Sequence, residues 1–443
     1  MNLLTGMVSV FALTATFLLS GCGGGSSGGG NVTPPTPQGP PGTLDSSFGT
    51  GGSVISAFGS YADGASVVVQ SDGKILVAGQ DFGVARFNAD GTLDLGFGAN
   101  GTAAMRIGSG VGAAKAVATQ PDGKIVVVGN QVVQTDVAVK SYCAILRFNS
   151  DGSPDVSFGT GGAVVTGIAN GNNVGCLAVV VQPDGKIVAA GGTFGVYPVF
   201  RLNVDGSRDM SFGNGGEVLT GCGQYSCAIA TVLIQPDGKI VVAGSAITAQ
   251  IPVYFAIGLV ARYDASGVLD PGFGAGGIEY IGGRVAPFTT VSSAALQPDG
   301  KIVVAGGYCG NCYEISQYLL ARLLPNGSLD PGFGTGGIVL SGLGGSGTVG
   351  LGVAVQTNGK IVIAGTKFPT GVMVARHDAV GAPDSTFGTA GITISPIAVT
   401  ATAEAMTLQN DGRIVVAGTA QTEIGTGGLQ AQSKVLVARY FGN

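Results

Sequence analysis

Acidic side chains are numerous in this sequence and could act as acids, bases or nucleophiles. Most of the 26 Asp and Glu residues stand at positions that recur along the chain, whereas eight do not. Two carboxyl groups held roughly 5–10 Å apart can cleave a glycosidic bond as acid and base or as acid and nucleophile. The eight non-recurrent acids are Asp63, Asp81, Asp136, Glu217, Glu279, Glu314, Glu404 and Glu423. They allow a hydrolase of envelope or extracellular glycans as one hypothesis, against the alternative of scattered, solvated loop acids.

The only histidine, His377, stands where equivalent segments carry Phe87, Phe148 and Tyr263. This position indicates packing rather than a catalytic base, and a serine triad or a histidine metal site would depend on His377 alone. Segments such as NADGTLD carry closely spaced oxygen ligands, but they lack the later bidentate Glu of an EF-hand calcium loop. We therefore predict no metal and no cofactor, and we assign no catalytic residue.

Six cysteines follow Cys22, and the motifs CGQYSC and CGNC stand in stretches that differ between otherwise similar segments. Close cysteines in a variable stretch can staple a loop, so we expect disulfides. The expected pairs are Cys222 with Cys227, Cys309 with Cys312 and, on less direct grounds, Cys143 with Cys176. A redox-active CxxC or a four-cysteine zinc site is the alternative, but no thioredoxin-like βαβ pattern surrounds the motif.

The first 42 residues differ in kind from the rest. The run VSVFALTATFLLSGC is shorter than the roughly 20 apolar residues that span a bilayer, and its end at Leu19–Cys22 resembles the lipobox of bacterial lipoproteins. The resemblance implies that residues 1–21 are a signal peptide and that Cys22 is lipidated; a plain secretory signal is the alternative. Residues 22–42 are rich in Gly, Ser and Pro and are expected to form a tether.

Two motifs recur seven times in step through the rest of the chain. Copies of QPDGKIVVAG begin at Gln70, Gln120, Gln182, Gln235, Gln297, Gln356 and Gln409. Copies of LDxSFGxxG begin at Leu44, Leu93, Pro154, Arg208, Leu269, Leu329 and Pro383. Repetition of this kind indicates one repeat domain over residues 43–443 rather than two or three separate domains.

Each repeat contains four short β-prone segments between Gly-rich or polar turns. In the first repeat they are Ser53–Ser56, Ala65–Gln70, Lys74–Ala78 and Val84–Asn88. The PDG sequence predicts a hairpin turn, because Pro presets one dihedral angle, Asp caps the backbone and Gly accepts a left-handed conformation. Seven repeats of four strands predict an all-β fold of 28 antiparallel strands.

An arginine follows each VAR-type strand, and the first six arginines are each followed by an Asp eight residues later. The last, Arg439, has no such Asp after it, and Asp45 has no such Arg before it. In a closed ring the two can complete each other. We therefore predict a seven-bladed β-propeller whose N-terminal strand, Ser53–Ser56, joins the last blade as its outer strand and closes it. The pattern leaves open whether the Arg and Asp form ion pairs or only mark turns.

Together with an intervening VARFNxDG, the two motifs resemble the delta-60 repeat family of bacterial β-propellers over residues 43–443. Departures such as Asn358 for the turn Asp and Arg413 for the Lys are local. The resemblance implies an exported propeller with no settled activity, so the fold alone does not supply the function.

The composition narrows the choice of partner. A net charge of -5 and a pI near 4.9 give no basic surface for nucleic acid. We expect a lipid-anchored monomer, exported to the outer membrane with a periplasmic or surface-facing body. Its expected role is binding or scaffolding at the cell envelope, with a protein or glycan partner.

The variable loops are the expected binding surface, since loops on a rigid scaffold commonly carry recognition. The three longest are Asn130–Tyr142, Ser245–Phe255 and Thr419–Ser433. Ile251, Tyr254 and Phe255 are the candidate contacts, because aliphatic and aromatic side chains dominate binding energy. The alternative is that these side chains pack on neighbouring blades.

Overall fold

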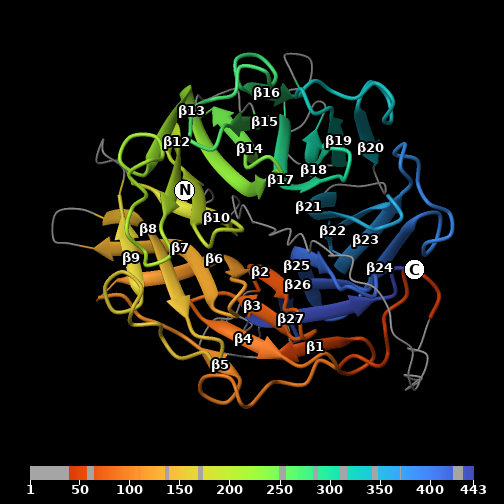
Figure 1. Cartoon of the computed structure of the whole chain (residues 1–443). Helices are drawn as coiled ribbons and strands as arrows, with labels where there is room; N and C mark the ends of the chain where they lie inside the picture. Colours follow the sequence, from red (N-terminus) through yellow and green to blue (C-terminus); the bar gives the residue numbers. More distant parts are fainter. Residues whose placement is uncertain are drawn as a thin grey trace, which may run out of the picture.

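The computed structural model describes residues 39–56, 64–108, 110–134, 139–167, 173–248, 256–282, 288–309, 317–341, 348–369, 371–422 and 433–443. These residues form β-strands and turns, and none of them forms a helix that could cross a bilayer. Figure 1 shows the sheets arranged radially around a common centre. The prediction of an all-β fold is confirmed, and the arrangement is that of a β-propeller.

Four sheets contain four antiparallel strands each, and in three of them the strands follow one another in chain order. The first is β2 (Ser66–Val69), β3 (Ile75–Ala78), β4 (Val84–Phe87) and β5 (Thr102–Ala103). The second is β6 (Val111–Thr119), β7 (Ile125–Gln134), β8 (Val139–Phe148) and β9 (Ala163–Thr166). The third is β21 (Thr348–Val355), β22 (Ile361–Lys367), β23 (Gly371–His377) and β24 (Ile392–Ser395).

The fourth of these sheets joins the two ends of the chain. It contains β25 (Thr400–Leu408), β26 (Ile414–Gln421), β27 (Ser433–Tyr440) and β1 (Ser53–Ser56). Strand β1 pairs antiparallel with β27, with Ser53 opposite Ala438 and Ser56 opposite Val435. The N-terminal strand therefore completes the last repeat, as the sequence predicts.

The remaining strands form one larger sheet of eleven strands. They are β10 (Gly175–Val181), β11 (Ile187–Gly192), β12 (Phe194–Leu202), β13 (Glu217–Ile234), β14 (Ile240–Thr248), β15 (Ala256–Tyr263), β16 (Ile278–Ile281), β17 (Phe288–Leu296), β18 (Ile302–Cys309), β19 (Gln317–Leu323) and β20 (Ile338–Ser341). The long strand β13 pairs with β12 mainly through Glu217–Gly221 and with β14 through Tyr225–Ile234. A single parallel pair, Ala256 with Phe288, joins β15 to β17.

The recurrent PDG motif forms the turn between the first two strands of each repeat. In the fourth copy the Gln235 amide donates to the Lys239 carbonyl at 2.8 Å, and the Gly238 amide donates to the Gln235 carbonyl at 2.9 Å. The Asp237 carboxylate accepts from the Lys239 amide, and Gly238 has a φ of 82°. A positive φ favours glycine, which explains the residue at this position.

Apolar residues from adjacent repeats share the core, and this holds for the first and last repeats as well. One buried cluster joins Phe48, Val67, Ile75, Val77, Ala85 and Phe87 to Ala405, Val415, Ala417, Val435 and Val437. The Gly64 amide also donates to the Gly418 carbonyl at 3.2 Å. We call this junction between the first repeat (β2–β5) and the last (β25–β27 with β1) the seam.

Two sequence expectations need correction at their boundaries. The expected loop Asn130–Tyr142 is largely strand, because β7 extends to Gln134 and β8 begins at Val139. Of the other two expected loops, Ser245–Phe255 and Thr419–Ser433, most residues lie outside the described ranges. At the N-terminus, folded contacts begin before residue 43, since the Gly388 amide donates to the Pro41 carbonyl and the Gly42 amide to the Phe441 carbonyl. The expected signal peptide, Cys22 and most of the tether lie outside the described residues.

Candidate functional site: a pocket at the seam

The recurrent charged residues form one ion cluster in every repeat. In six repeats the arginine Nε lies 2.7–2.9 Å from the Asp Oδ2, and the Lys that follows the PDG turn lies 2.7–3.2 Å from the same carboxylate. Each arginine also covers the Phe of the FG motif, with the guanidinium carbon 4.4–4.8 Å from the ring centroid. The Arg and Asp are therefore structural ion pairs, which settles the question that the sequence left open.

The arginines also tie each repeat to the next. Nη1 of each donates to a turn carbonyl of the following repeat, beginning with Arg86 to Ser150 at 2.5 Å. The same bond joins Arg147 to Val204, Arg201 to Ala265, Arg262 to Pro325, Arg322 to Ala379 and Arg376 to Gly442. The last arginine, Arg439, donates to the carbonyl of Ala89 in the first repeat. The series of bonds thus returns to its start.

These contacts keep the cluster carboxylates ionised. For Asp155, burial favours the neutral acid, but hydrogen bonds from Ser157, Lys124 and Arg147 outweigh it and hold the pKa below its ordinary value. The pKa values of Asp209 and Asp384 are lowered by the same balance of burial and hydrogen bonds. A carboxylate in this state accepts hydrogen bonds and is a poor proton donor, so the recurrent clusters serve structure rather than acid catalysis.

At the seam the cluster is different, because two arginines share one carboxylate. Asp45 is fully buried, and its Oδ2 lies 2.8 Å from Arg439 Nη2 and 2.9 Å from Arg413 Nε. Burial opposes ionisation, but bonds from Ser47 and the two guanidinium groups hold the pKa of Asp45 below its ordinary value. Arg413 also pairs with Asp411 at 2.5 Å.

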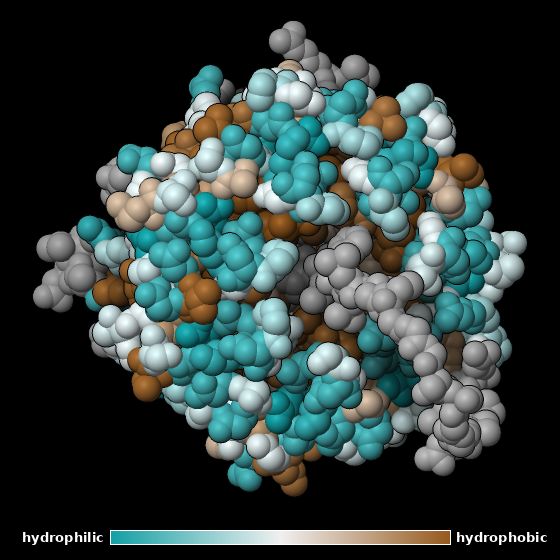
Figure 2. All heavy atoms as spheres, in the orientation of Figure 1, coloured by the Kyte–Doolittle hydropathy of each residue, from teal (hydrophilic) through white to brown (hydrophobic). Residues whose placement is uncertain are grey.

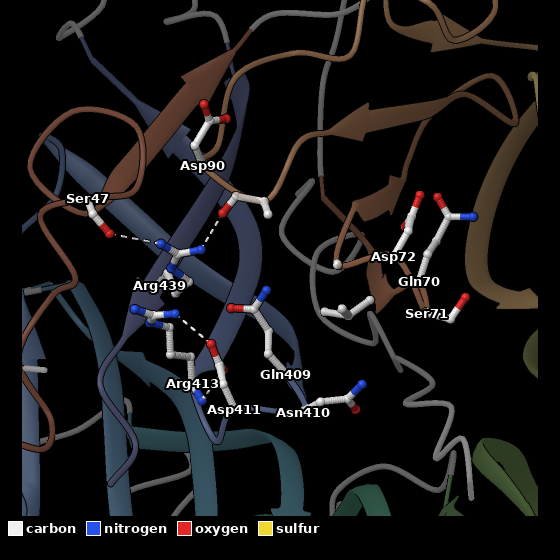
Figure 3. A pocket seen from close by; sticks show the side chains of 13 residues that line it. Ser47, Gln70, Ser71, Asp72, Asp90, Gln409, Asn410, Asp411, Arg413 and Arg439 are labelled. Atoms are coloured by element: carbon white, nitrogen blue, oxygen red, sulfur yellow. Dashed lines mark hydrogen bonds and ion pairs between the residues drawn. The ribbon is translucent and has the colours of Figure 1, made fainter. Parts of the chain in front are cut away.

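A pocket of about 600 Å³ opens beside this cluster. Its walls are the turn Gln70–Gly73 of the first repeat, the turn at Ala89 and Asp90, and the corresponding turn of the last repeat, Gln409–Asp411. Figure 3 shows Gln70, Ser71 and Asp72 on one side and Arg413, Arg439 and Asp411 on the other. We call this the seam pocket.

Residues that break the repeat meet in the seam pocket. Ser71 and Asn410 replace the turn Pro found at Pro121, Pro183, Pro236 and Pro298, and Arg413 replaces the Lys. The seam pocket therefore differs in composition from the corresponding regions between Pro-containing turns. The sequence showed each departure separately, and their convergence depends on the first and last repeats being neighbours.

The eight non-recurrent acids do not form an active site among the described residues. Four of them, Asp63, Asp136, Glu314 and Glu423, lie outside those residues. Asp81 faces Arg106 at 3.8 Å, and Glu217 pairs with Arg208 at 3.1 Å. Burial raises the pKa of Glu279, which lies on β16, and Glu404 lies on β25 and accepts a hydrogen bond from Thr402. None of these four lines the seam pocket, so the hydrolase hypothesis gains no support.

The cysteines are joined as follows. Cys143 on β8 is bonded to Cys176 on β10, across two sheets, and Cys222 is bonded to Cys227 within β13. Both pairings are among those expected from the sequence. Cys309 is also disulfide-bonded, while its expected partner Cys312 lies outside the described residues.

His377 is a buried packing residue, as expected. It is 1% exposed; its Nδ1 lies 2.9 Å from the Gly381 carbonyl and its Nε2 3.0 Å from the Tyr318 hydroxyl. Burial lowers its pKa below the ordinary value. Within the described ranges, no group of three or more His, Cys, Asp or Glu residues is arranged to hold a metal ion. The candidate contacts Ile251, Tyr254 and Phe255 lie outside those ranges.

Five segments of this chain match one known protein family. Residues 70–97, 120–158, 182–212, 235–273 and 297–333 match the family described as "Domain of unknown function (DUF5122) beta-propeller". Each segment begins at the Gln of a PDG motif. No curated protein sequence matches the chain.

Solved structures similar to this chain include the following three, all of low sequence identity. "YCF48 bound to D1 peptide" has 10% identity and a TM-score of 0.44, covering 88% of this chain and 98% of that one. The RRP9 WD40 repeats have 10% identity and a TM-score of 0.48, with coverage of 91% and 100%. The Cps50 (Swd1) propeller domain of Myceliophteria thermophila has 8% identity and a TM-score of 0.46, with coverage of 87% and 99%.

Proposed function

Because five segments of the chain match the DUF5122 beta-propeller family, we propose that the chain is a seven-bladed propeller that binds or scaffolds a partner at the cell envelope. The observation that carries this proposal is that the recurrent Arg, Lys and Asp of each ion cluster are paired with one another, and each of the seven Arg also bonds a neighbouring repeat. What distinguishes one part of the ring from another is then the set of residues that depart from the repeat. Such a rigid frame with unequal surface positions suits recognition.

The seven-blade count is supported by the eleven-stranded sheet. Its pairings divide into three units of four strands, because β13 serves as the outer strand of one unit through Glu217–Gly221 and as the inner strand of the next through Tyr225–Ile234. These three units and the four separate sheets make seven. The arginine bond from Arg439 to Ala89 supports closure of the ring.

A binding role is supported by the surface. Figure 2 shows hydrophilic residues over much of one face, interrupted by separate apolar patches. Several apolar side chains are strongly exposed, including Leu95, Val156 and Met210 at equivalent positions of three successive repeats, with exposures of 69%, 75% and 74%. We propose a protein or glycan partner, contacted in part by Ile251, Tyr254 and Phe255.

The location is proposed from the N-terminal sequence. Lipid on Cys22 would anchor a monomeric propeller to the outer membrane through the Gly/Ser/Pro-rich tether. The disulfides Cys143–Cys176 and Cys222–Cys227 agree with an exported body, because disulfides persist in oxidising compartments. Membrane fractionation of wild type and Cys22→Ser tests this part: the wild type should sediment with membranes and the variant should not.

Affinity capture from envelope extract tests the binding proposal. The bait is residues 39–443, because Pro41 and Gly42 contribute folded contacts. The matched variant replaces Ile251, Tyr254 and Phe255 with Ser and leaves β14 intact. A partner retained by the wild-type bait and lost with the variant is the expected result. If the same proteins or glycans are captured by both baits, or nothing exceeds background, these side chains do not form the recognition surface.

A further inference from the structure

We propose that the seam pocket binds a cationic group that carries N–H donors, a protonated amine or a guanidinium. This inference deepens the proposed binding function and rests on it, by assigning a second contact region and its chemistry. Its basis is the pocket itself: its size, the state of its arginines, its unpaired acceptors and the residues that set it apart from the rest of the ring.

The size of the seam pocket suits a small ligand or one side chain of a larger one. Its volume of about 600 Å³ falls within the range of ligand pockets, roughly 300–1,000 Å³. Figure 3 shows the turn that carries Asp72 across the pocket from the side that carries Arg439. Because the walls come from turns held by the seam contacts, little rearrangement is needed for binding.

The two arginines of the pocket are already committed. Arg439 Nε binds Asp45, its Nη1 donates to the Ala89 carbonyl, and its Nη2 donates to Ser47 Oγ at 3.1 Å. Arg413 pairs with both Asp45 and Asp411. The positive charges of Arg413 and Arg439 therefore offset the negative charges of Asp45 and Asp411, and these four groups together carry no net charge.

Two further carboxylates leave an excess of negative charge. Asp72 and Asp90 are exposed, line the pocket and have no ion-pair partner among the described residues. Hydrogen bonds from the Thr92 hydroxyl and amide lower the pKa of Asp90, so it is ionised at neutral pH. The site thus carries about two uncompensated negative charges, which attract a cation.

The pocket also has hydrogen-bond acceptors without donors. The amide oxygens of Gln70 and Gln409 are buried and have no hydrogen-bond partner. The same is true of Gln182, Gln235, Gln297 and Gln356, so the feature belongs to the repeat. At the seam, two of these amides line one pocket with two unpaired carboxylates. The two amide oxygens are covered, so the acceptors that a ligand rich in N–H groups can reach are the exposed carboxylates of Asp72 and Asp90.

The source of such a cation is either a free polyamine or a Lys or Arg side chain of a peptide. Both present the same charge and donors to Asp72 and Asp90. They differ in what surrounds the pocket, since a peptide also covers neighbouring surface. Binding assays with spermidine and with an N-acetylated, C-amidated Gly-Arg-Gly-Lys-Gly peptide separate the two sources.

The test is isothermal titration of residues 39–443 with each probe at low and at moderate salt. The key variant is Asp72→Asn with Asp90→Asn, which keeps the oxygen that caps each turn. Asparagine is compatible with both turns, because Asn358 and Asn326 cap the equivalent turns of other repeats at 3.0 and 3.1 Å. The matched control is Asp122→Asn with Asp151→Asn, which makes the same charge change at the next junction.

At least one probe should bind the wild type, and binding should weaken as salt is raised. The Asp72/Asp90 variant should bind at least about tenfold more weakly, since hydrogen bonds to charged groups contribute that much. The Asp122/Asp151 control should bind as the wild type does. Tight binding of spermidine alone assigns a free amine, and tight binding of the peptide alone assigns a partner side chain.

Three results overturn the inference: no binding of either probe, equal weakening by both double variants, or equal binding by the Asp72/Asp90 variant and the wild type. Each double variant should show an unchanged circular dichroism spectrum, so that loss of binding is not loss of fold. Failure here is distinguishable from failure of the proposed function, because envelope capture depends on Ile251, Tyr254 and Phe255 and is measured separately.

Discussion

Replacement of Asp45 by Asn should destabilise this protein more than the same change in any other repeat. Asp45 is fully buried and is the only carboxylate among the seven described ion clusters that serves two arginines. Asn keeps the oxygen that caps Ser47, so the change removes charge and little else. It leaves Arg413 and Arg439, whose side chains are 11% and 6% exposed, without their shared counter-ion.

The expected loss of unfolding free energy follows from leaving two nearly buried guanidinium groups without their shared counter-ion. Removing one partner of a buried ion pair costs about 3–5 kcal/mol, because the other charge stays desolvated. For a two-state domain of about 400 residues this corresponds to a fall in the melting temperature of roughly 4–6 °C. The comparison is Asp330→Asn, whose partners are Arg322 and Lys301. Lys301 is 27% exposed and can turn its ammonium into water, so the cost should be smaller.

Differential scanning calorimetry of wild type, Asp45→Asn and Asp330→Asn measures the difference. Arg413→Lys restores the residue found in the other repeats and should cost less than about 1 kcal/mol, since Lys suits the same position elsewhere. The reasoning is refuted if Asp45→Asn unfolds at the same temperature as Asp330→Asn, because the shared carboxylate would then contribute no more than an ordinary one.

Three further changes test other parts of the fold. Burial lowers the pKa of His377 from 6.5, so the wild type should lose stability as the pH falls below 6.5; in urea titrations from pH 7.5 to 5, the stability of the wild type relative to His377→Phe should fall with acid. Replacing Cys143 and Cys176 together by Ser should cost about 3–4 kcal/mol for a loop of 33 residues, seen as a lower urea midpoint. Arg208→Leu alone should cost about 3–5 kcal/mol because Glu217 stays buried. Adding Glu217→Ile should restore most of that loss, since other repeats carry Leu and Ile there; a double variant no more stable than Arg208→Leu would contradict this.

Much of the fold could be predicted because the same local sequence signals for strands and turns recur in every repeat. The PDG turn, the glycine that follows it and the alternating apolar strands are local signals, and seven copies reduce ambiguity. The pairing of Ser53–Ser56 with the last repeat was predictable because Asp45 and Arg439 are each incomplete alone. Strand ends were less predictable: β7, β8 and β14 continue into stretches whose composition resembles loops.

The seam pocket could not be predicted in the same way. Asp72, Asp90 and Asp411 occupy turn positions that recur in every repeat. A comparison of the repeats therefore assigns them to the turns and not to a binding site. Their convergence is a tertiary effect of the ring, and the local sequence carries no signal of it. The available signal was Ser71, Asn410 and Arg413, three departures that fall in the first and last repeats and line one pocket where those repeats meet.

The central claim is that the N-terminal segment closes the ring and thereby forms the pocket at the seam. Hydrogen–deuterium exchange tests it most directly, by comparing Leu44–Ser56 with the equivalent segment Leu269–Ile281. We predict similar protection of both segments in the wild type, and faster exchange of Leu44–Ser56 and Ser433–Tyr440 in Asp45→Asn, with Leu269–Ile281 unchanged. Rapid exchange of Leu44–Ser56 in the wild type, with Leu269–Ile281 protected, would contradict the account.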